Sequence, residues 1–163
     1  MTRKLDWKAA IWAAIIAGLV FMMLEMALTV MLQGQSAWGP PRMIAAMVLG
    51  SGVLPPPATF DPMIMMVAMV VHMMVSVALA VVLGLAISRL ALHTMASILL
   101  GTVFGIVVYL VNFYGFTALF PWFAMARGPI SIFSHAMYGA VLGGGYAIIA
   151  QNDVGKTEWP TAA

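Results

Sequence analysis

Cysteine is absent from this chain of 163 residues, and charged residues make up only 7% of it. The lack of cysteine excludes disulfide bridges, thiolate metal ligands and thiol catalysis. Soluble domains carry about 25% charged residues, so this chain has too few to cover a surface that faces water. Its seven lysines and arginines are also too few and too dispersed to form a face that binds nucleic acid.

Apolar residues fill most of the chain, at 64% of the sequence and a mean hydropathy of +1.06. They gather in four long runs, at about 9–32, 62–87, 94–118 and 129–150. Each run has close to the ~20 residues that a helix needs to cross the hydrocarbon of a lipid bilayer. We therefore predict an all-α integral membrane protein, a four-transmembrane-helix bundle over residues 9–150.

Local signals define the segments between the runs. Asp61 precedes Pro62, and an aspartate that can cap the free amides followed by a proline in the first turn is typical of a helix start. Gly128-Pro129 marks the start of the fourth run. Residues 33–61 form the longest loop. Its apolar segment Met43–Leu49 is too short to span a bilayer, so it lies along the membrane surface or dips toward the bundle. Residues 151–163 read as a polar tail.

Basic residues predict the orientation. One side of the membrane holds five of them, namely Arg3, Lys4, Lys8, Arg89 and Lys156, and the other side holds Arg42 and Arg127. The positive-inside rule therefore places the N-terminal segment 1–8 and the tail 151–163 in the cytoplasm, with loop 33–61 outside.

Each apolar run contains one strongly polar residue at a similar depth: Glu25, His72, Asn112 and His135. With a rise of about 1.5 Å per residue, all four fall in the outer half, within a band roughly 10 Å thick. Polar groups in lipid are costly, so they turn inward and find partners. We predict that the four side chains meet inside the bundle.

Small residues share the helix faces of these polar residues, at spacings of seven or eleven or in successive steps of four. They are Gly18, Ser76, Ala80, Gly84, Gly101, Gly105, Gly139 and Gly143. Gly101–Gly105 and Gly139–Gly143 also match the GxxxG pattern of closely packed membrane helices. These faces are predicted to be the helix-packing surface.

Several chemistries fit the polar group. His72 and His135, on different helices, could ligate the iron of a haem b, or together with Glu25 hold an iron, copper or zinc ion. A Glu–His pair could also relay protons. Alternatively, the polar layer only joins helices, a role that Asn112 suits well. Arg127, close to Trp122, could contact an anionic headgroup or act as an interface anchor.

Four segments resemble a group of short bacterial membrane proteins that sometimes carry the label "sodium:proline symporter". The segments are Trp38–Gly50, Leu54–Asp61, Tyr109–Phe116 and Phe120–Arg127. The resemblance implies a four-span protein of the bacterial inner membrane and supplies no catalytic residues. The symporter label does not suit the size of the chain, because such symporters are assemblies of ten or more spans.

The sequence thus predicts a small membrane protein that binds haem or a transition metal. An accessory subunit of a larger membrane complex of respiratory type, and a proton-linked small transporter acting as a homo-oligomer, are the alternatives. No catalytic motif is found, so an enzyme acting alone is not expected.

Overall fold

The computed structural model describes residues 4–157, with side chains through residue 151. Arg3 and the ends of the two terminal segments therefore lie outside the described residues, as does the side chain of Lys156. The described chain is all-α, and its four long helices are long and apolar enough to cross a membrane. They are α1 (Trp7–Gln33), α3 (Pro62–Leu90), α4 (Thr94–Leu110, continued to Ala118 by a π-helical and a 3-10 turn) and α5 (Pro129–Thr157).

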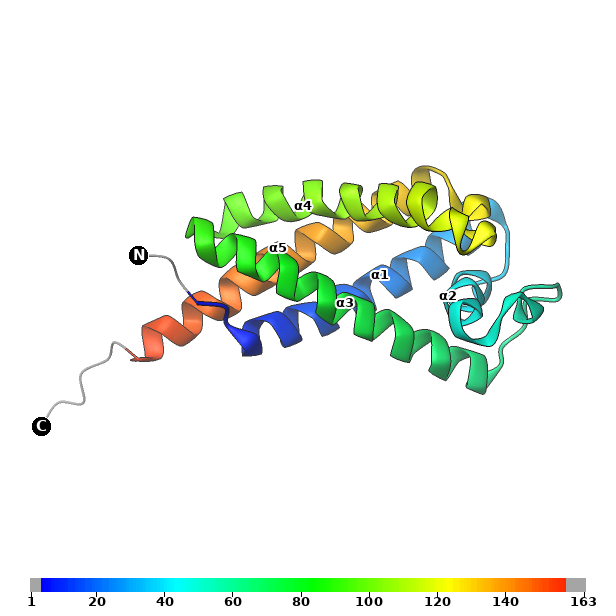
Figure 1. The fold of residues 1–163 in the computed structure, drawn as a ribbon, viewed down its shortest axis with the longest axis horizontal. Coiled ribbons are helices and arrows are strands. Elements are labelled where there is room, and N and C mark those ends of the chain that lie inside the picture. The colour runs from blue at the N-terminus through cyan, green and yellow to red at the C-terminus, as the bar shows by residue number, and fades with distance from the viewer. Residues whose placement is uncertain (1–3, 158–163) are drawn as a thin grey trace, which may run out of the picture.

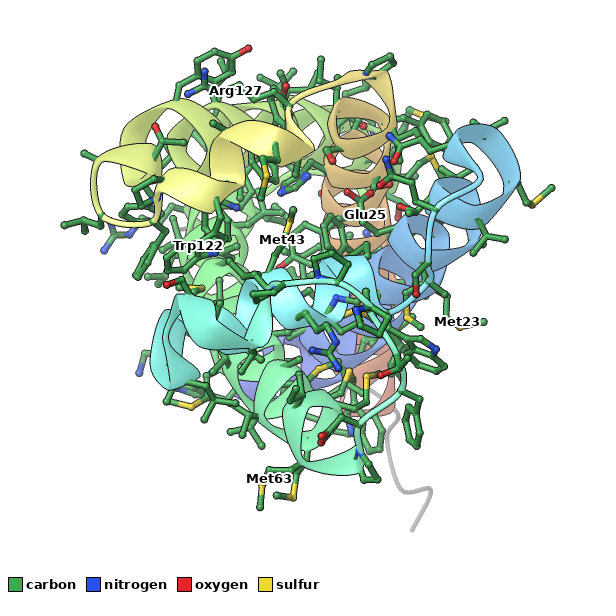
Figure 2. The ribbon with its side chains drawn as sticks, turned by 90° about the vertical axis from the view of Figure 1, so that its right-hand side faces the viewer. Met23, Glu25, Met43, Met63, Trp122 and Arg127 are labelled. Carbon is green, nitrogen blue, oxygen red and sulfur yellow. The ribbon has the colours of Figure 1, made fainter. Side chains whose placement is uncertain are left out.

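Lipid-facing side chains cover the outside of this bundle. Large apolar residues such as Met23, Met31 and Met74 are about seven-tenths exposed, which suits a protein whose solvent is hydrocarbon. Met23 and Met63 point away from the helices in the end-on view (Figure 2). The chain is a four-span membrane protein, as its composition predicts.

The helix ends follow the sequence signals. The Asp61 carboxylate accepts hydrogen bonds from the amides of Met63 and Ile64, and Pro62 opens α3. Asp6 caps α1 in the same way, through the amide of Ala9. At the other end α5 continues past residue 151 to Thr157, so the predicted tail begins as helix.

The four helices diverge toward one end of the molecule. Helix α5 packs against both α4 and α1, and α1 also packs against α3. Helix α3 leans away from α4, and the short helix α2 (Gly39–Leu49) fills the space between them, against α3 (Figure 1). We call this the α2 end, and the opposite end, where residue 4 and the turn at residues 91–93 lie, the terminal end.

The third span is not a regular helix throughout. It changes from α4 to a π-helical turn at Val111–Gly115, then to a short 3-10 turn at Phe116–Ala118. Arg127 holds this break, because its Nε donates to the carbonyl oxygen of Phe113 over 2.7 Å. Another 3-10 helix, η4 (Pro121–Ala126), then folds back toward α2 before α5 begins.

Side-chain bonds fix the long loop over the α2 end. The Arg42 guanidinium donates to the carbonyl oxygens of Val53 and Thr59. The indole of Trp122 donates to the carbonyl oxygen of Met43 over 3.0 Å, which ties η4 to α2 (Figure 2). The apolar segment of the loop therefore dips onto the bundle.

Candidate functional site

A cavity of about 210 Å³ lies at the α2 end, between the diverging helices. Its wall includes the four polar residues predicted from the sequence: Glu25 from α1, His72 from α3, Asn112 from the π-helical turn and His135 from α5. Thr29 and Ser131 add two hydroxyl groups. The volume is below the ~300–1,000 Å³ of drug-sized pockets, so it suits a few water molecules or a small molecule.

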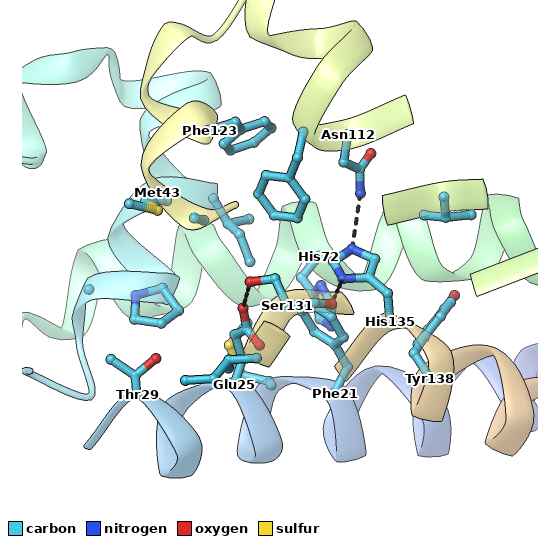
Figure 3. A pocket seen from close by; sticks show the side chains of 18 of the residues that line it. Phe21, Glu25, Thr29, Met43, His72, Asn112, Phe123, Ser131, His135 and Tyr138 are labelled. Carbon is cyan, nitrogen blue, oxygen red and sulfur yellow. Dashed lines mark hydrogen bonds between the residues drawn. The ribbon is translucent and has the colours of Figure 1, made fainter. Parts of the chain in front are cut away.

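Glu25 is the buried acid of this cavity, with only 7% of its surface exposed. The hydroxyl of Ser131 donates to its Oε1 over 2.5 Å, which joins α1 to α5 (Figure 3). Its other oxygen, Oε2, is buried and has no hydrogen-bond partner among the described residues. A buried carboxyl oxygen without a partner costs free energy, so this atom is available to a ligand.

His135 is held from both sides (Figure 3). Its Nδ1 donates to the carbonyl oxygen of Ser131, 2.7 Å away, since a carbonyl can only accept. In the neutral ring Nε2 then accepts from the Asn112 amide nitrogen, 3.3 Å away. Phe21, Tyr109 and Phe113 each meet the ring in a T-shaped contact. This imidazole is fixed in one orientation and one tautomer.

His72 approaches the same space from α3. Its Nε2 donates to the carbonyl oxygen of Gly18 on α1, over 2.9 Å, which leaves Nδ1 as an acceptor. The ring of Phe21 stacks on His72 at 5.3 Å between centroids and meets His135 edge-on at 4.7 Å. Phe21 therefore contacts both imidazoles.

This geometry bears on metal binding. Among the side chains of residues 4–151, no three from His, Asp or Glu come together to hold a metal ion. His135 Nε2 could ligate only if Asn112 moved away, and Phe21 fills the space beside both rings. The site as it stands can donate and accept hydrogen bonds, and Glu25 contributes its carboxyl group.

The predicted packing glycines lie in two different contacts. Gly101 and Gly105 face Gly139 and Gly143 so closely that a Cβ on any of them would collide with the backbone of the other helix. Gly18 and Gly84 face side chains instead, at Met73 and Tyr146 respectively. Ser76 and Ala80 are both 1% exposed, and Ser76 bonds to Ala14 on α1 and Tyr138 on α5.

Arg127 and Trp122 lie apart from the cavity wall. Arg127 bonds to Phe113 and Thr117, and its guanidinium lies 4.4 Å from the ring centre of Tyr114. The indole N–H of Trp122 donates to the carbonyl oxygen of Met43. In this conformation both polar groups serve the fold at the α2 end.

Sequence reasoning did not single out Phe21 or the residues that α2 and η4 add to the wall, among them Met43, Met47 and Phe123. In a chain with 16 methionines and eight phenylalanines, an apolar residue in a run carries no signal of its own. The MxxxM spacing of Met43 and Met47 marks one face of a helix, but it does not indicate what that face covers.

Comparison with family models, with curated proteins and with solved structures found no match. The resemblance to short bacterial membrane proteins therefore stays a prediction, and the site must be interpreted from its own geometry.

Proposed function

We propose that this chain is a membrane-embedded binding protein that takes a small molecule into the cavity at the α2 end. The observation that carries the proposal is the composition of the cavity wall, where polar side chains from four separate helical segments meet in an otherwise apolar enclosure. Ligand sites have this character, with apolar walls and a few polar groups that fix orientation. Asn112 also lies on a π-helical turn, a feature frequent at functional sites.

Haem or a single iron, copper or zinc ion is the second candidate ligand. It is favoured by two imidazoles and one carboxyl group on the wall of one cavity. It requires Asn112 to leave His135 and Phe21 to move, so the conformation described here supports an organic ligand better.

The distribution of basic residues supports an orientation in which the α2 end faces out of the cytoplasm. The ligand then enters from the extracytoplasmic side. An accessory subunit or a transporter could each use such a site, and binding is the step that both share.

Native mass spectrometry of the protein released from nanodiscs tests the proposal. We expect the purified chain to carry a bound small molecule that Ala126→Trp abolishes, because Ala126 lines the cavity and an indole there fills it. Ala118→Trp is the matched control, since Ala118 is exposed at the same end and does not line the cavity. The mass of the adduct separates an organic ligand from haem or a metal ion. Adducts that are identical in all three proteins would contradict the proposal.

A further inference from the structure

The charge and hydrogen-bonding pattern of the cavity narrows the class of ligand. Glu25 is its only carboxyl group among the described residues, and one oxygen of that group is already bonded to Ser131. The free oxygen, Oε2, lacks a donor and belongs to a side chain that is more than nine-tenths buried. A ligand that supplies an N–H or O–H group to this atom removes the cost of leaving it unpaired.

The neighbouring groups add acceptors. The neutral tautomer of His72 that donates to Gly18 presents an unprotonated Nδ1. Asn112 turns its amide nitrogen toward His135, and this assignment follows because His135 Nδ1 already holds the ring proton. The amide oxygen of Asn112 is therefore left to accept. The wall also holds the amides of Gln33 and Gln35 and the hydroxyl of Thr29, so the preference for a donor rests on Glu25 Oε2, the buried acceptor without a partner.

No lysine or arginine lines the cavity in the part of the chain that the structure describes. Arg42 and Arg127, the basic residues of the α2 end, are bonded to backbone carbonyls of the loop and of the third span. Glu25 thus has no lysine or arginine beside it in the cavity. A carboxylate in an apolar setting is costly in free energy unless a cation pairs with it.

Aromatic rings and thioethers line the cavity beside aliphatic side chains and the amides of Gln33 and Gln35. The rings of Phe21, Phe113 and Phe123 line it, together with the sulfur-bearing side chains of Met22, Met43 and Met47. Aromatic faces attract cations, and thioethers adapt to the shape of an apolar body.

We infer that the cavity selects a small organic cation, a protonated amine on a compact apolar body, with Glu25 as its counter-ion. The volume of about 210 Å³ suits a single-ring amine. The ammonium group donates to Glu25 Oε2, the buried oxygen that lacks a partner, while the apolar body packs against the phenylalanine and methionine side chains. This inference rests on the proposed binding function.

Two probes of equal shape and different charge test it. Benzylamine is protonated at pH 7, and benzyl alcohol is its neutral counterpart. Binding of each is measured by equilibrium dialysis against the full chain in nanodiscs of zwitterionic phosphatidylcholine, so that the lipid itself does not concentrate cations. We expect the amine to bind at least about tenfold more tightly than the alcohol, because charge-assisted hydrogen bonds are roughly twice as strong as neutral ones.

Glu25→Gln is expected to remove that preference while leaving the shape of the cavity unchanged. Asp61→Asn is the matched control, because Asp61 is a carboxyl group at the same end that caps α3 outside the cavity, and asparagine caps equally well. It should leave the preference intact. Thermal unfolding of both variants shows whether the fold is retained.

The outcomes separate the two proposals. Equal binding of both probes, lost in Ala126→Trp, would keep the cavity as a binding site and overturn the cation inference. A preference for the amine that persists in Glu25→Gln would overturn the role of Glu25. Binding of neither probe to the wild-type chain would overturn the inference and count against the cavity as a site for ligands of this size.

Discussion

The terminal end and the α2 end of the bundle are built from the same four helices but on opposite packing principles. At the terminal end, α1 turns five alanines inward, all with no exposed surface, and from there to the level of His135 α4 meets α5 through glycines in backbone contact. At the α2 end, the helices present Glu25, two imidazoles and several phenylalanine rings, and a cavity remains between them. Small residues let the helices pack without a gap between them, and bulky polar or aromatic residues hold the helices apart.

The comparison shows how one bundle combines rigidity with a site. Backbone contact through small residues is the main way in which helices associate in lipid, where the hydrophobic effect between helices is absent. The terminal end thus stabilises the assembly, and the α2 end is free to hold costly polar groups. Substitutions should therefore have different effects at the two ends.

The largest effect is expected where α4 and α5 touch. In Gly139→Ala the new Cβ would collide with the carbonyl of Gly101 and lie 2.9 Å from the nitrogen of Gly105. Backbone atoms cannot step aside as side chains do, so we expect a loss of about 3 kcal/mol in the free energy of unfolding, at the upper end of overpacking effects. Unfolding in mixed detergent micelles, followed by circular dichroism, measures it.

Gly115→Ala makes the same chemical change at the α2 end. Its Cβ would meet only Val111 Cγ1, at 4.0 Å, and its backbone, at φ −84°, accepts alanine. We expect no loss and a gain of up to about 1 kcal/mol, because alanine restricts the unfolded chain. Equal losses in the two variants would contradict the proposed difference between the ends.

Tyr146→Phe is expected to have an intermediate effect at the terminal end. The Tyr146 hydroxyl bonds to Ser88 over 2.6 Å and accepts from the Asp6 amide over 3.0 Å, so it joins α5 to α3 and to the start of α1. Its removal leaves two groups unpaired, and we expect a loss of about 1.7 kcal/mol, the upper limit for such bonds in membranes. The measurement is again unfolding in micelles.

Tyr138→Phe provides the comparison for that loss. Tyr138 bonds to Ser76, but the Ser76 hydroxyl also donates to the carbonyl oxygen of Ala14 over 2.8 Å and keeps that bond in the variant. We expect a loss of about 0.6 kcal/mol, the average for membrane hydrogen bonds. A larger loss at Tyr138 than at Tyr146 would show that the hydroxyl bonds of the terminal end do not join its helices as described.

Much of the fold could be predicted from the sequence because its signals are local. The length of each apolar run gives a span, and Asp61 with Pro62 marks the start of α3 to the residue. The break in the third span could not be predicted, since the segment Val111–Gly115 holds no proline and depends on Arg127, fourteen residues later. The divergence of α3, which opens the cavity, is likewise set by the distant helix α2.

The candidate site, like the fold, could be predicted from the sequence only where the signal is local. Four polar residues at one depth are visible in the sequence, because polarity within an apolar run stands out. The sequence does not show which of those residues form hydrogen bonds with which partners. Glu25 bonds to Ser131 and His135 to Asn112, and these partners depend on helix rotations and on the ring of Phe21. Spacing therefore predicted a common level but could not give the chemistry at that level.

A small predicted effect tests whether polar bonds at the α2 end contribute little to stability. Ser131→Ala removes the hydroxyl that donates to Glu25, and we expect a loss of about 0.6 kcal/mol. Ser134→Ala is an unusually close control, one turn along the same helix, because the Ser134 hydroxyl is fully buried and has no partner among the described residues. Deleting an unsatisfied hydroxyl should leave stability unchanged or raise it slightly. If Ser131→Ala instead cost as much as Gly139→Ala, the bond between α1 and α5 at Glu25 would be a main structural support, and the polar layer would be better explained as helix-joining than as a binding site.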